Sequence, residues 1–206
     1  MSAHDKGGFV SRAGIKLAAA LDAFGLDVRG LCCADLGCQV GGFTDCLLAR
    51  GAASVYAVDV SYGQLAWSLR QDRRVVVMER TNALYLDPWK QANFAGCDLV
   101  TIDLGWTRQK LAVPAALRWC RSDRPARIVT LIKPHYEAAA TRQHRGVLAA
   151  VEALEVAEQV LATMPQAGAS VLKQMRSPIL GGGRNRKGNT EYLALLAPMR
   201  RPTSST

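Results

Sequence analysis

The sequence predicts an α/β protein built on a doubly wound, mostly parallel sheet, and three observations support this prediction. Short apolar runs alternate with amphipathic stretches along most of the 206 residues. A glycine-rich turn follows the first apolar run, and charged residues end several of the other runs. Alternating strands and helices imply parallel strands joined by right-handed crossovers. A chain of this length fits one well-filled domain.

The elements expected along the chain begin with a helix over Arg12–Phe24, with Ser11 as its N-cap and Gly25 as its stop. The other helices are expected at Phe43–Arg50, Gln64–Arg70, Leu111–Cys120 and Gly146–Met164. The expected strands are Leu31–Asp35, Ser54–Asp59, Arg74–Glu79, Asp98–Asp103, Arg127–Ile132, Ser170–Met175 and Glu191–Leu196. The last two strands are joined without a helix, so we expect them to be antiparallel. The expected organisation is an N-terminal tail (1–10), one domain (11–198) and a disordered tail (199–206).

The composition indicates a basic protein without a membrane span. The chain carries 26 basic and 17 acidic residues, which gives a net charge of +9. Arginine binds phosphates well, so the charge favours a polyanion as partner, although an arginine-rich soluble protein would show the same balance. No apolar run is long enough to span a membrane, and the N-terminus lacks a secretory signal, which predicts a cytoplasmic protein. No cysteine pair has C-x-x-C spacing, so we expect no metal site.

The turn in the segment ADLGCQVGGF predicts a nucleoside cofactor. Asp35 precedes Gly37, and Gly41 and Gly42 follow. This spacing differs from G-x-G-x-x-G, and a carboxylate ahead of the first glycine disfavours a phosphate. It suits a cationic ligand that bears an amino acid, such as S-adenosylmethionine, and Asp59 is placed to hold a ribose. The alternative is a tight strand-to-helix turn that binds nothing.

Charged residues follow or end several of the expected strands. They include Asp35, Asp59, Asp103 and Lys133, and a loop over Gly181–Thr190 leads into Glu191. Ligands of doubly wound sheets bind beyond the carboxyl ends of the strands. The sequence therefore predicts that these groups converge on one rim of the sheet.

Several motifs occur in order from Phe9 to Leu196: FVSRAGIKL, DLGCQVGGFTDCLLARG, VTIDLGW, LIKPHYE and KGNTEYLALL. In these motifs the chain resembles the FtsJ-like ribose 2′-O-methyltransferases, and within them the haemolysin-A-like (TlyA) branch. The resemblance implies a Rossmann-like, S-adenosylmethionine-dependent methyltransferase fold whose seven-stranded, mostly parallel sheet has an antiparallel final strand. It also implies ribose 2′-O-methylation of ribosomal RNA.

The resemblance implies site residues by position. The catalytic tetrad would be Lys16, Asp103, Lys133 and Glu191. S-adenosylmethionine would be bound by Asp35, Gly37, Gly41, Gly42, Phe43, Asp59, Asn82 and Asp103. Within the tetrad we expect Lys133 to lie nearest the hydroxyl and to deprotonate or steer it, with the carboxylates orienting the lysines and Lys16 holding the substrate oxygen or its adjacent phosphate. A lysine acts as a base only if its pKa falls.

RNA contacts are expected from basic residues near the rim, which are Arg12, Arg184, Arg186 and Lys187. Such residues hold phosphates. Trp106, just past Asp103, is placed to stack on a base or simply to pack.

Members of this branch usually carry a small N-terminal RNA-binding domain, which we expect this chain to lack. The chain also departs from the branch at Cys38, Gln39, Val40, Gly105 and Trp106. Two alternatives stay open: a methyltransferase acting on a non-RNA substrate, and a non-catalytic protein that binds ribosomal RNA or acts as a haemolysin. The sequence does not predict the RNA, the nucleotide, a ribosomal subunit over free RNA, or the oligomeric state.

Overall fold

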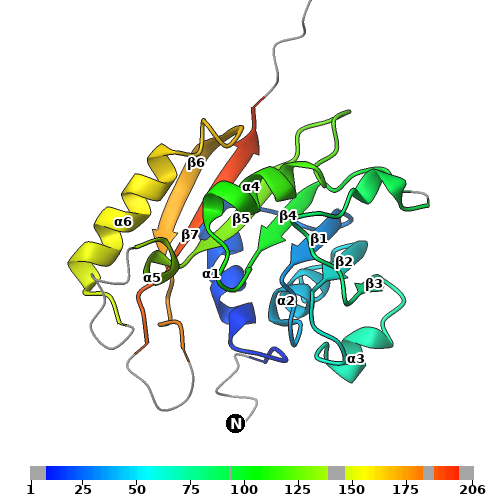
Figure 1. Cartoon of the computed structure of the whole chain (residues 1–206). Coiled ribbons are helices and arrows are strands. Elements are labelled where there is room, and N and C mark those ends of the chain that lie inside the picture. The colour runs from blue at the N-terminus through cyan, green and yellow to red at the C-terminus, as the bar shows by residue number, and fades with distance from the viewer. Residues whose placement is uncertain (1–7, 93, 139–146, 183–187, 200–206) are drawn as a thin grey trace, which may run out of the picture.

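A computed structural model describes residues 8–92, 94–138, 147–182 and 188–199. A seven-stranded sheet runs through the molecule in the order β3-β2-β1-β4-β5-β7-β6 (Figure 1). The pairs from β3 to β5 are parallel, whereas β7 is antiparallel to both of its neighbours. The chain order reverses between β1 and β4, and the adjacent carboxyl ends of these strands are where such sheets bind ligands.

The elements have the following bounds. The strands are β1 Cys32–Leu36, β2 Ser54–Val58, β3 Val75–Met78, β4 Leu99–Ile102, β5 Arg127–Ile132, β6 Ala169–Arg176 and β7 Tyr192–Pro198. The helices are α1 Ala13–Phe24, α2 Gly42–Ala49, α3 Trp67–Arg70, α4 Gln109–Leu117, α5 Pro134–Glu137 and α6 Ala150–Ala162, with a 3₁₀ turn, η2, at Pro88–Lys90.

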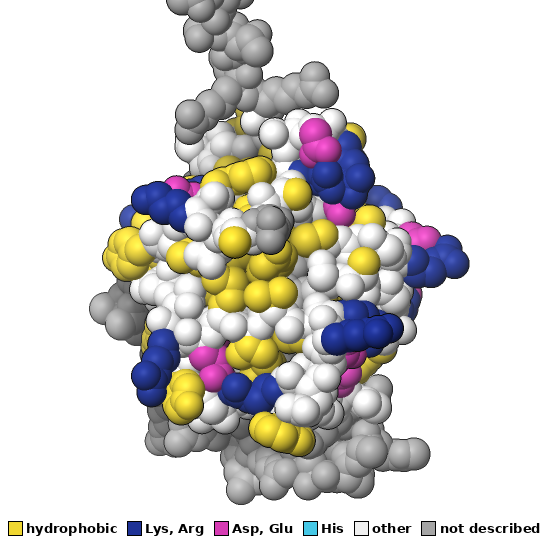
Figure 2. Space-filling model, turned by 90° about the vertical axis from the view of Figure 1, so that its right-hand side faces the viewer, with side chains coloured by type: hydrophobic (Ala, Val, Ile, Leu, Met, Phe, Trp, Pro, Cys, Tyr) yellow, Lys and Arg dark blue, Asp and Glu magenta, His cyan; other side chains and the backbone are white. Residues whose placement is uncertain are grey.

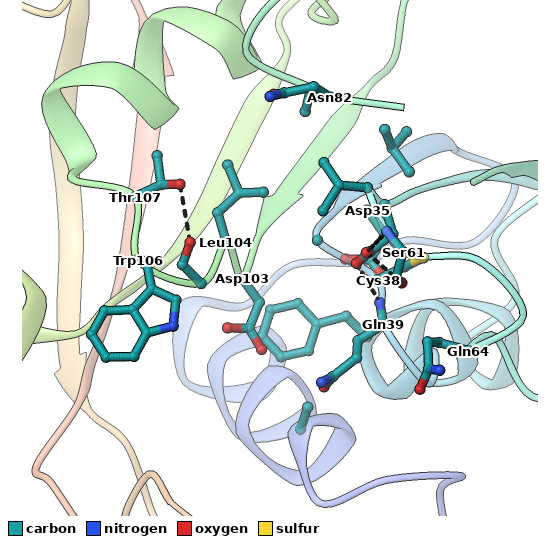
Figure 3. Close-up of a pocket in the computed structure, with 18 of the residues that line it drawn as sticks. Asp35, Cys38, Gln39, Ser61, Gln64, Asn82, Asp103, Leu104, Trp106 and Thr107 are labelled. Carbon is teal, nitrogen blue, oxygen red and sulfur yellow. Dashed lines mark hydrogen bonds between the residues drawn. The ribbon is translucent and has the colours of Figure 1, made fainter. Parts of the chain in front are cut away.

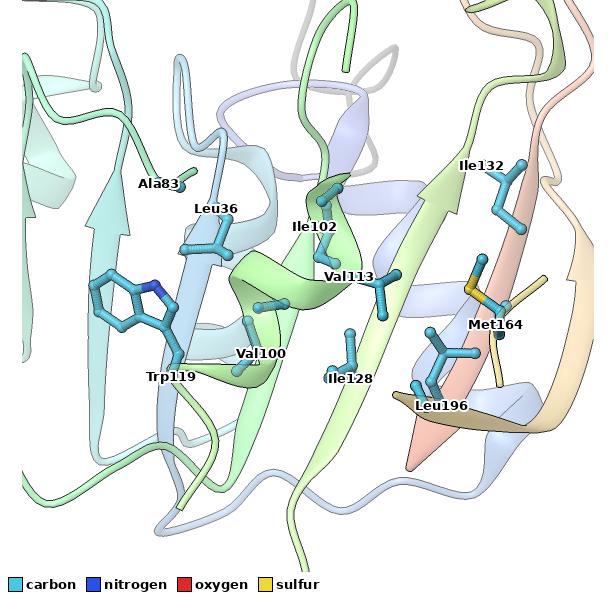
Figure 4. Close-up of a cluster of buried hydrophobic side chains, with 14 of the residues drawn as sticks. Leu36, Ala83, Val100, Ile102, Val113, Trp119, Ile128, Ile132, Met164 and Leu196 are labelled. Atoms are coloured by element: carbon cyan, nitrogen blue, oxygen red, sulfur yellow. The ribbon is translucent and has the colours of Figure 1, made fainter. Parts of the chain in front are cut away.

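Helices cover both faces of the sheet, as parallel strands require. One buried apolar cluster joins α1 and α2 to the sheet, for example through Leu17 and Leu47. The other joins α4 and α6 to the opposite face, and Figure 4 shows Val113 of α4 close to the strand residues Val100 and Ile128. All five of these side chains are fully buried.

The predicted fold class is confirmed. The sheet has seven strands, and β6 and β7 are antiparallel as expected. Gly25 ends α1 in the left-handed conformation, at φ 69°. Ser11 was expected as the N-cap of this helix, and that expectation is wrong, because Arg12 takes the cap position and no side chain makes the capping hydrogen bond.

Several helices differ from the sequence-based expectation. The helix α4 begins two residues before Leu111, and α6 begins at Ala150. The helix expected over Gln64–Arg70 is shortened to α3, because Ala66 has a ψ of 139°, outside the helical range, and takes the N-cap position. The short helix α5 was not expected. Pro134 occupies its first position, where the fixed φ of proline favours a helix start.

β3 is one edge strand of the sheet, and Figure 2 shows the side of the molecule on which it lies. Hydrophobic side chains gather in its middle, and Lys and Arg side chains are spread around its rim rather than collected in one patch. Val76 and Val77 of β3 are among the exposed apolar residues. No helix of the described residues is long and apolar enough to cross a membrane.

Candidate active site

Two cavities open at the carboxyl ends of the central strands. The larger has a volume of about 1010 Å³ and is lined by residues that follow β1, β2, β3, β4 and β5. The smaller has a volume of about 510 Å³ and lies against the start of α1 and the loop before β7. The two spaces adjoin, because seven residues line both of them: Ser11, Ala13, Gln39, Asp103, Lys133, Tyr136 and Gly182. The charged ones among them are Asp103 and Lys133.

The turn after β1 brings backbone close to the floor of the larger cavity. Gly37 has φ 91°, and a Cβ atom on it would lie 2.6 Å from the backbone oxygen of Asp103. Its N–H donates to the Val58 carbonyl at the end of β2. Only glycine fits this position, because a side chain would push β1 and β4 apart where their ends meet.

Asp59 ties two loops of the larger cavity together. Its Oδ2 accepts the Gln39 N–H at 2.9 Å, and its Oδ1 accepts the N–H and hydroxyl of Ser61 at 2.8 and 2.6 Å. In Figure 3 Gln39 and Ser61 lie beside each other and Asn82 lies on another side of the pocket. Asp59 and Asn82 both line the cavity, where an acid and an amide are suited to a nucleoside.

Asp35 lies within β1 and is fully buried, although it borders the larger cavity. Its Oδ2 accepts the N–H and hydroxyl of Thr44 at 2.9 and 2.7 Å, and its Oδ1 accepts the Thr101 hydroxyl at 3.0 Å. Burial raises the pKa of this carboxyl to about 7, and the hydrogen bonds from the two threonines offset only part of that effect. The geometry shows Asp35 fastening the start of α2 to the sheet.

The remaining glycine-turn residues divide into two groups. Phe43 lines the larger cavity, whereas Gly41 and Gly42 do not. A Cβ atom on Gly41 would lie 2.3 Å from Leu69 Cδ1, and one on Gly42 would lie 2.1 Å from Ser11 Oγ. These two glycines are required by the packing of α2 against its neighbours. Their predicted contact with a cofactor is not tested by this geometry.

The four residues expected to form the tetrad come together as two ion pairs. Lys16 Nζ of α1 lies 2.5 Å from Glu191 Oε2, and Lys133 Nζ lies 2.5 Å from Asp103 Oδ1. All four line the smaller cavity. The Lys16–Glu191 pair is the more deeply buried, with side chains 11% and 4% exposed.

Burial and neighbouring charges shift the pKa of Lys133 in opposite directions. Burial lowers the pKa of its ammonium, but the carboxylates of Asp103 and Glu191 outweigh burial, so the pKa is raised. Burial raises the pKa of the Glu191 carboxyl, and the Lys16 charge counters this only in part. The two carboxylates therefore favour the ammonium form of Lys133.

The loop before β7 packs closely against the Glu191 side chain. A Cβ atom on Gly181 would lie 2.0 Å from Glu191 Oε1. The backbone of Gly181 forms two hydrogen bonds with Asn189, which close the base of the loop. Arg12 lines the smaller cavity and donates to the Leu180 carbonyl at 3.5 Å. The other basic residues expected at the rim, Arg184, Arg186 and Lys187, lie outside the described residues.

Sequence reasoning singled out Trp106 but missed Tyr136 and His135, which lie in a row with it beside the tetrad. Trp106 is 86% exposed and stacks on Tyr136 with ring centroids 4.6 Å apart, and the His135 ring lies 4.2 Å from that of Tyr136. Lys133 Nζ lies 5.5 Å from the Tyr136 ring centroid. The motif LIKPHYE contained His135 and Tyr136, but only the helix α5 turns both toward the smaller cavity. Within the described segments, no group of three or more His, Cys, Asp and Glu side chains could hold a metal ion.

Comparison with known proteins yields one family. The sequence profile of the FtsJ-like methyltransferases matches residues 9–196. The 16S/23S rRNA (cytidine-2′-O)-methyltransferase TlyA of Mycobacterium tuberculosis is 53% identical over 129 residues, which cover 63% of this chain and 47% of that protein. Hemolysin A of Brachyspira hyodysenteriae is 35% identical over 188 residues, which cover 90% and 75%. The chain thus spans about half the length of the mycobacterial relative.

Solved structures agree with the sequence matches. A provisionally named hemolysin from Streptococcus thermophilus superposes with a TM-score of 0.86 at 37% identity, over 94% of this chain and 68% of that one. An S-adenosylmethionine-dependent methyltransferase from Mesorhizobium loti superposes with a TM-score of 0.59 at 16% identity, over 87% and 96%. The second likeness concerns the fold alone.

Proposed function

The chain belongs to the FtsJ-like methyltransferase family, and from this premise we propose that it transfers a methyl group from S-adenosylmethionine to a ribose 2′-hydroxyl of ribosomal RNA. One observation supports this most strongly. The Lys133–Asp103 pair borders both cavities, so a group held in the larger one meets an acceptor held in the smaller one at these two side chains.

The larger cavity fits S-adenosylmethionine in size and in chemistry. Its volume of about 1010 Å³ is at the upper end of small-ligand sites. Gly37 lets the ends of β1 and β4 meet at the cavity, and the Asp59 carboxylate that lines it is suited to ribose hydroxyls. Among the residues that the structure describes, Asp35, Asp59 and Asp103 line it and Lys133 is the only basic one, which suits a cation better than a phosphate. The bound cofactor supplies an activated methyl group on a sulfonium.

The residues of the smaller cavity would position the acceptor. Because its pKa is raised, Lys133 would act as an ammonium that donates a hydrogen bond to the hydroxyl oxygen and steers it, rather than as a base. Asp103 orients this ammonium at 2.5 Å. Lys16, which is held by Glu191, would place a second positive charge near the substrate oxygen or an adjacent phosphate. Much of the rate would come from this alignment.

Several features favour RNA as the acceptor. The net charge of +9 suits a polyanion, and Arg12 lies at the smaller cavity. Trp106 offers an exposed indole face beside the tetrad, on which an unpaired base could stack. The mycobacterial relative acts on 16S and 23S rRNA by its name, which supports ribosomal RNA, free or within a ribosomal subunit, and a cytoplasmic site of action.

The test is transfer of tritium from labelled S-adenosylmethionine to ribosomal subunits, free ribosomal RNA and transfer RNA, followed by alkaline hydrolysis. A 2′-O-methyl group blocks cleavage at its own nucleotide, so the expected label appears in alkali-resistant dinucleotides and is absent with Lys133→Ala. Label in mononucleotides would show base methylation instead. Transfer only to a small-molecule extract would contradict RNA as the substrate.

A further inference from the structure

Two cysteines meet at the end of the sheet opposite the two cavities. Cys32 is the first residue of β1, and Cys97 precedes β4, the parallel neighbour of β1. Their sulfur atoms lie 3.8 Å apart, although the residues are 65 positions apart in the chain. Neither residue lines the larger or the smaller cavity. Cys32 and Cys97 therefore form a dithiol at the amino ends of two central strands, away from the proposed site of methyl transfer.

Backbone hydrogen bonds hold these two residues next to each other. The Cys32 carbonyl accepts the Asp98 N–H at 2.8 Å, and the Cys32 N–H donates to Asp98 Oδ2 at 3.0 Å. On its other side, the Cys97 N–H donates to the Trp119 carbonyl at 2.7 Å, and the Cys97 carbonyl accepts the Arg121 N–H at 3.0 Å. A disulfide needs a sulfur–sulfur distance of about 2 Å. Rotation of the two side chains can close the remaining gap while the strands stay in place.

Cys32 is the more reactive member of the pair. It is partly exposed, whereas the other five cysteines of the chain, all within the described residues, are buried. The hydrogen bond with Cys97 lowers the pKa of the Cys32 thiol to about 6, against the opposing effect of burial. Cys97 is fully buried, and its hydrogen bond with Cys32 raises the pKa of its thiol. An oxidant from solvent therefore meets a thiolate at Cys32, with a second thiol beside it.

We propose that Cys32 and Cys97 form a reversible disulfide in response to hydrogen peroxide. The Cys32 thiolate attacks one peroxide oxygen and becomes a sulfenic acid, while the O–O bond breaks and the other oxygen leaves as hydroxide, which takes up the proton that the thiol had lost. The Cys97 sulfur then attacks the Cys32 sulfur, and the sulfenic hydroxyl leaves with the Cys97 proton as water. Two thiols thus give two electrons to one peroxide, which becomes two molecules of water. A dithiol reductant reverses the reaction by thiol–disulfide exchange.

The test is a titration of the full chain with hydrogen peroxide, followed by alkylation of free thiols with iodoacetamide, digestion with trypsin and mass spectrometry. Tryptic cleavage places the two cysteines in separate peptides, 30–50 and 91–108. The expected product is a linkage between these two peptides that dithiothreitol removes. Oxidation of Cys32 to sulfinic or sulfonic acid, without a linked peptide at any peroxide concentration, would overturn the proposal.

Variants assign the linkage to one cysteine of peptide 30–50, which contains four. Cys32→Ser and Cys97→Ser are each expected to abolish it. Cys33→Ala is the matched control and should keep it, because Cys33 packs into the apolar cluster of α1 and α2, on the opposite face of the sheet from Cys97. A linkage that persists in Cys32→Ser, or that disappears in Cys33→Ala, would overturn the proposal.

A second measurement uses the wild-type chain and does not depend on how the variants fold. Native protein is treated briefly with a limiting amount of iodoacetamide, and the alkylated cysteine is identified. Cys32 is expected to react first, and about 10-fold faster at pH 7 than at pH 5, because the thiolate fraction rises across a pKa of about 6. Faster alkylation of any buried cysteine would overturn the proposal. Neither measurement involves methyl transfer, so both are independent of the proposed function.

Discussion

Lys133 Nζ and Asp103 Oδ1 lie 2.5 Å apart, and both side chains line the larger and the smaller cavity. Each residue directly follows a strand, Asp103 after β4 and Lys133 after β5, and these strands are parallel neighbours. The sheet therefore holds the backbones of these two residues on neighbouring strand ends, which brings the two side chains within reach of each other.

Replacing Lys133 by alanine should remove the ammonium that steers the acceptor. We expect kcat to fall by about 10²- to 10³-fold or more, the usual cost of losing one preorganised donor. The affinity for S-adenosylmethionine, measured by calorimetry, should stay within a few-fold. Lys110→Ala is the matched control, because this lysine is exposed on α4 and lines neither cavity. Retained turnover in Lys133→Ala would exclude the assigned role.

Gly181→Ala should act on the tetrad through Glu191. The added Cβ atom would lie 2.0 Å from Glu191 Oε1, so the carboxylate must move away from Lys16. We expect at least about a 10-fold loss in kcat and a destabilisation of about 1–3 kcal/mol, as overpacking typically causes. Gly105→Ala adds the same methyl group in open space and should leave the thermal unfolding midpoint unchanged. A wild-type kcat in Gly181→Ala, together with equal thermal unfolding midpoints for the two variants, would contradict the expected clash.

Trp106→Ala tests base stacking at the rim. Stacking on an aromatic side chain contributes about 1–3 kcal/mol per base, so the KM for RNA should rise by about 5- to 150-fold. Because the indole is 86% exposed, the melting temperature should change little. Trp106→Phe should retain most of the RNA affinity. The stacking role would be abandoned if Trp106→Ala bound RNA as well as the wild type.

Asp35→Asn should change how stability depends on pH. The pKa of Asp35 is about 7 in the folded protein and near 3.8 in the unfolded chain, so between these values the folded protein binds the extra proton. Its stability relative to the variant must then fall as the pH rises from about 4 to about 7. An amide fits the site, since its oxygen can accept from Thr44 and its nitrogen can donate to Thr101 Oγ1.

Urea unfolding midpoints measured from pH 4 to pH 8 check this prediction. We expect the variant to gain about 1–4 kcal/mol on the wild type across the window. Asp22→Asn is the control, because the hydrogen bond from Arg50 lowers the pKa of the Asp22 carboxyl. A parallel pH dependence for wild type and Asp35→Asn would show that Asp35 is ionised in the folded protein.

The strands could be predicted because their signal is local. Runs such as SVYAV and RIVTLI are mostly apolar and lead into the charged residues Asp59 and Lys133, and both form largely buried strands. The first residue of α3 could not be predicted, because Ala66 takes an extended ψ of 139° while its N–H bonds to the Val40 carbonyl of a distant turn. Periodicity in the sequence carries no record of such bonds.

The sequence predicted which charged residues come together, but not which lysine pairs with which carboxylate. The motifs place Lys16, Asp103, Lys133 and Glu191 as a set, and only the fold shows which lysine contacts which carboxylate. At Gly41 and Gly42 the sequence could not show why a glycine is needed. The sequence shows that glycine is present, whereas the distances to Leu69 and Ser11 show that packing alone is enough to require it.

Lys16 and Glu191 are 175 positions apart, and Glu191 directly precedes β7, which lies between β5 and β6 in the sheet. During synthesis, the glycine turn and the first five strands emerge long before this residue does. A nascent chain can therefore assemble the larger cavity while the tetrad is still incomplete. Under the proposed function, methyl transfer would have to wait until β7 has left the ribosome and inserted between strands made earlier, so the order of translation itself would delay activity until the sheet is closed.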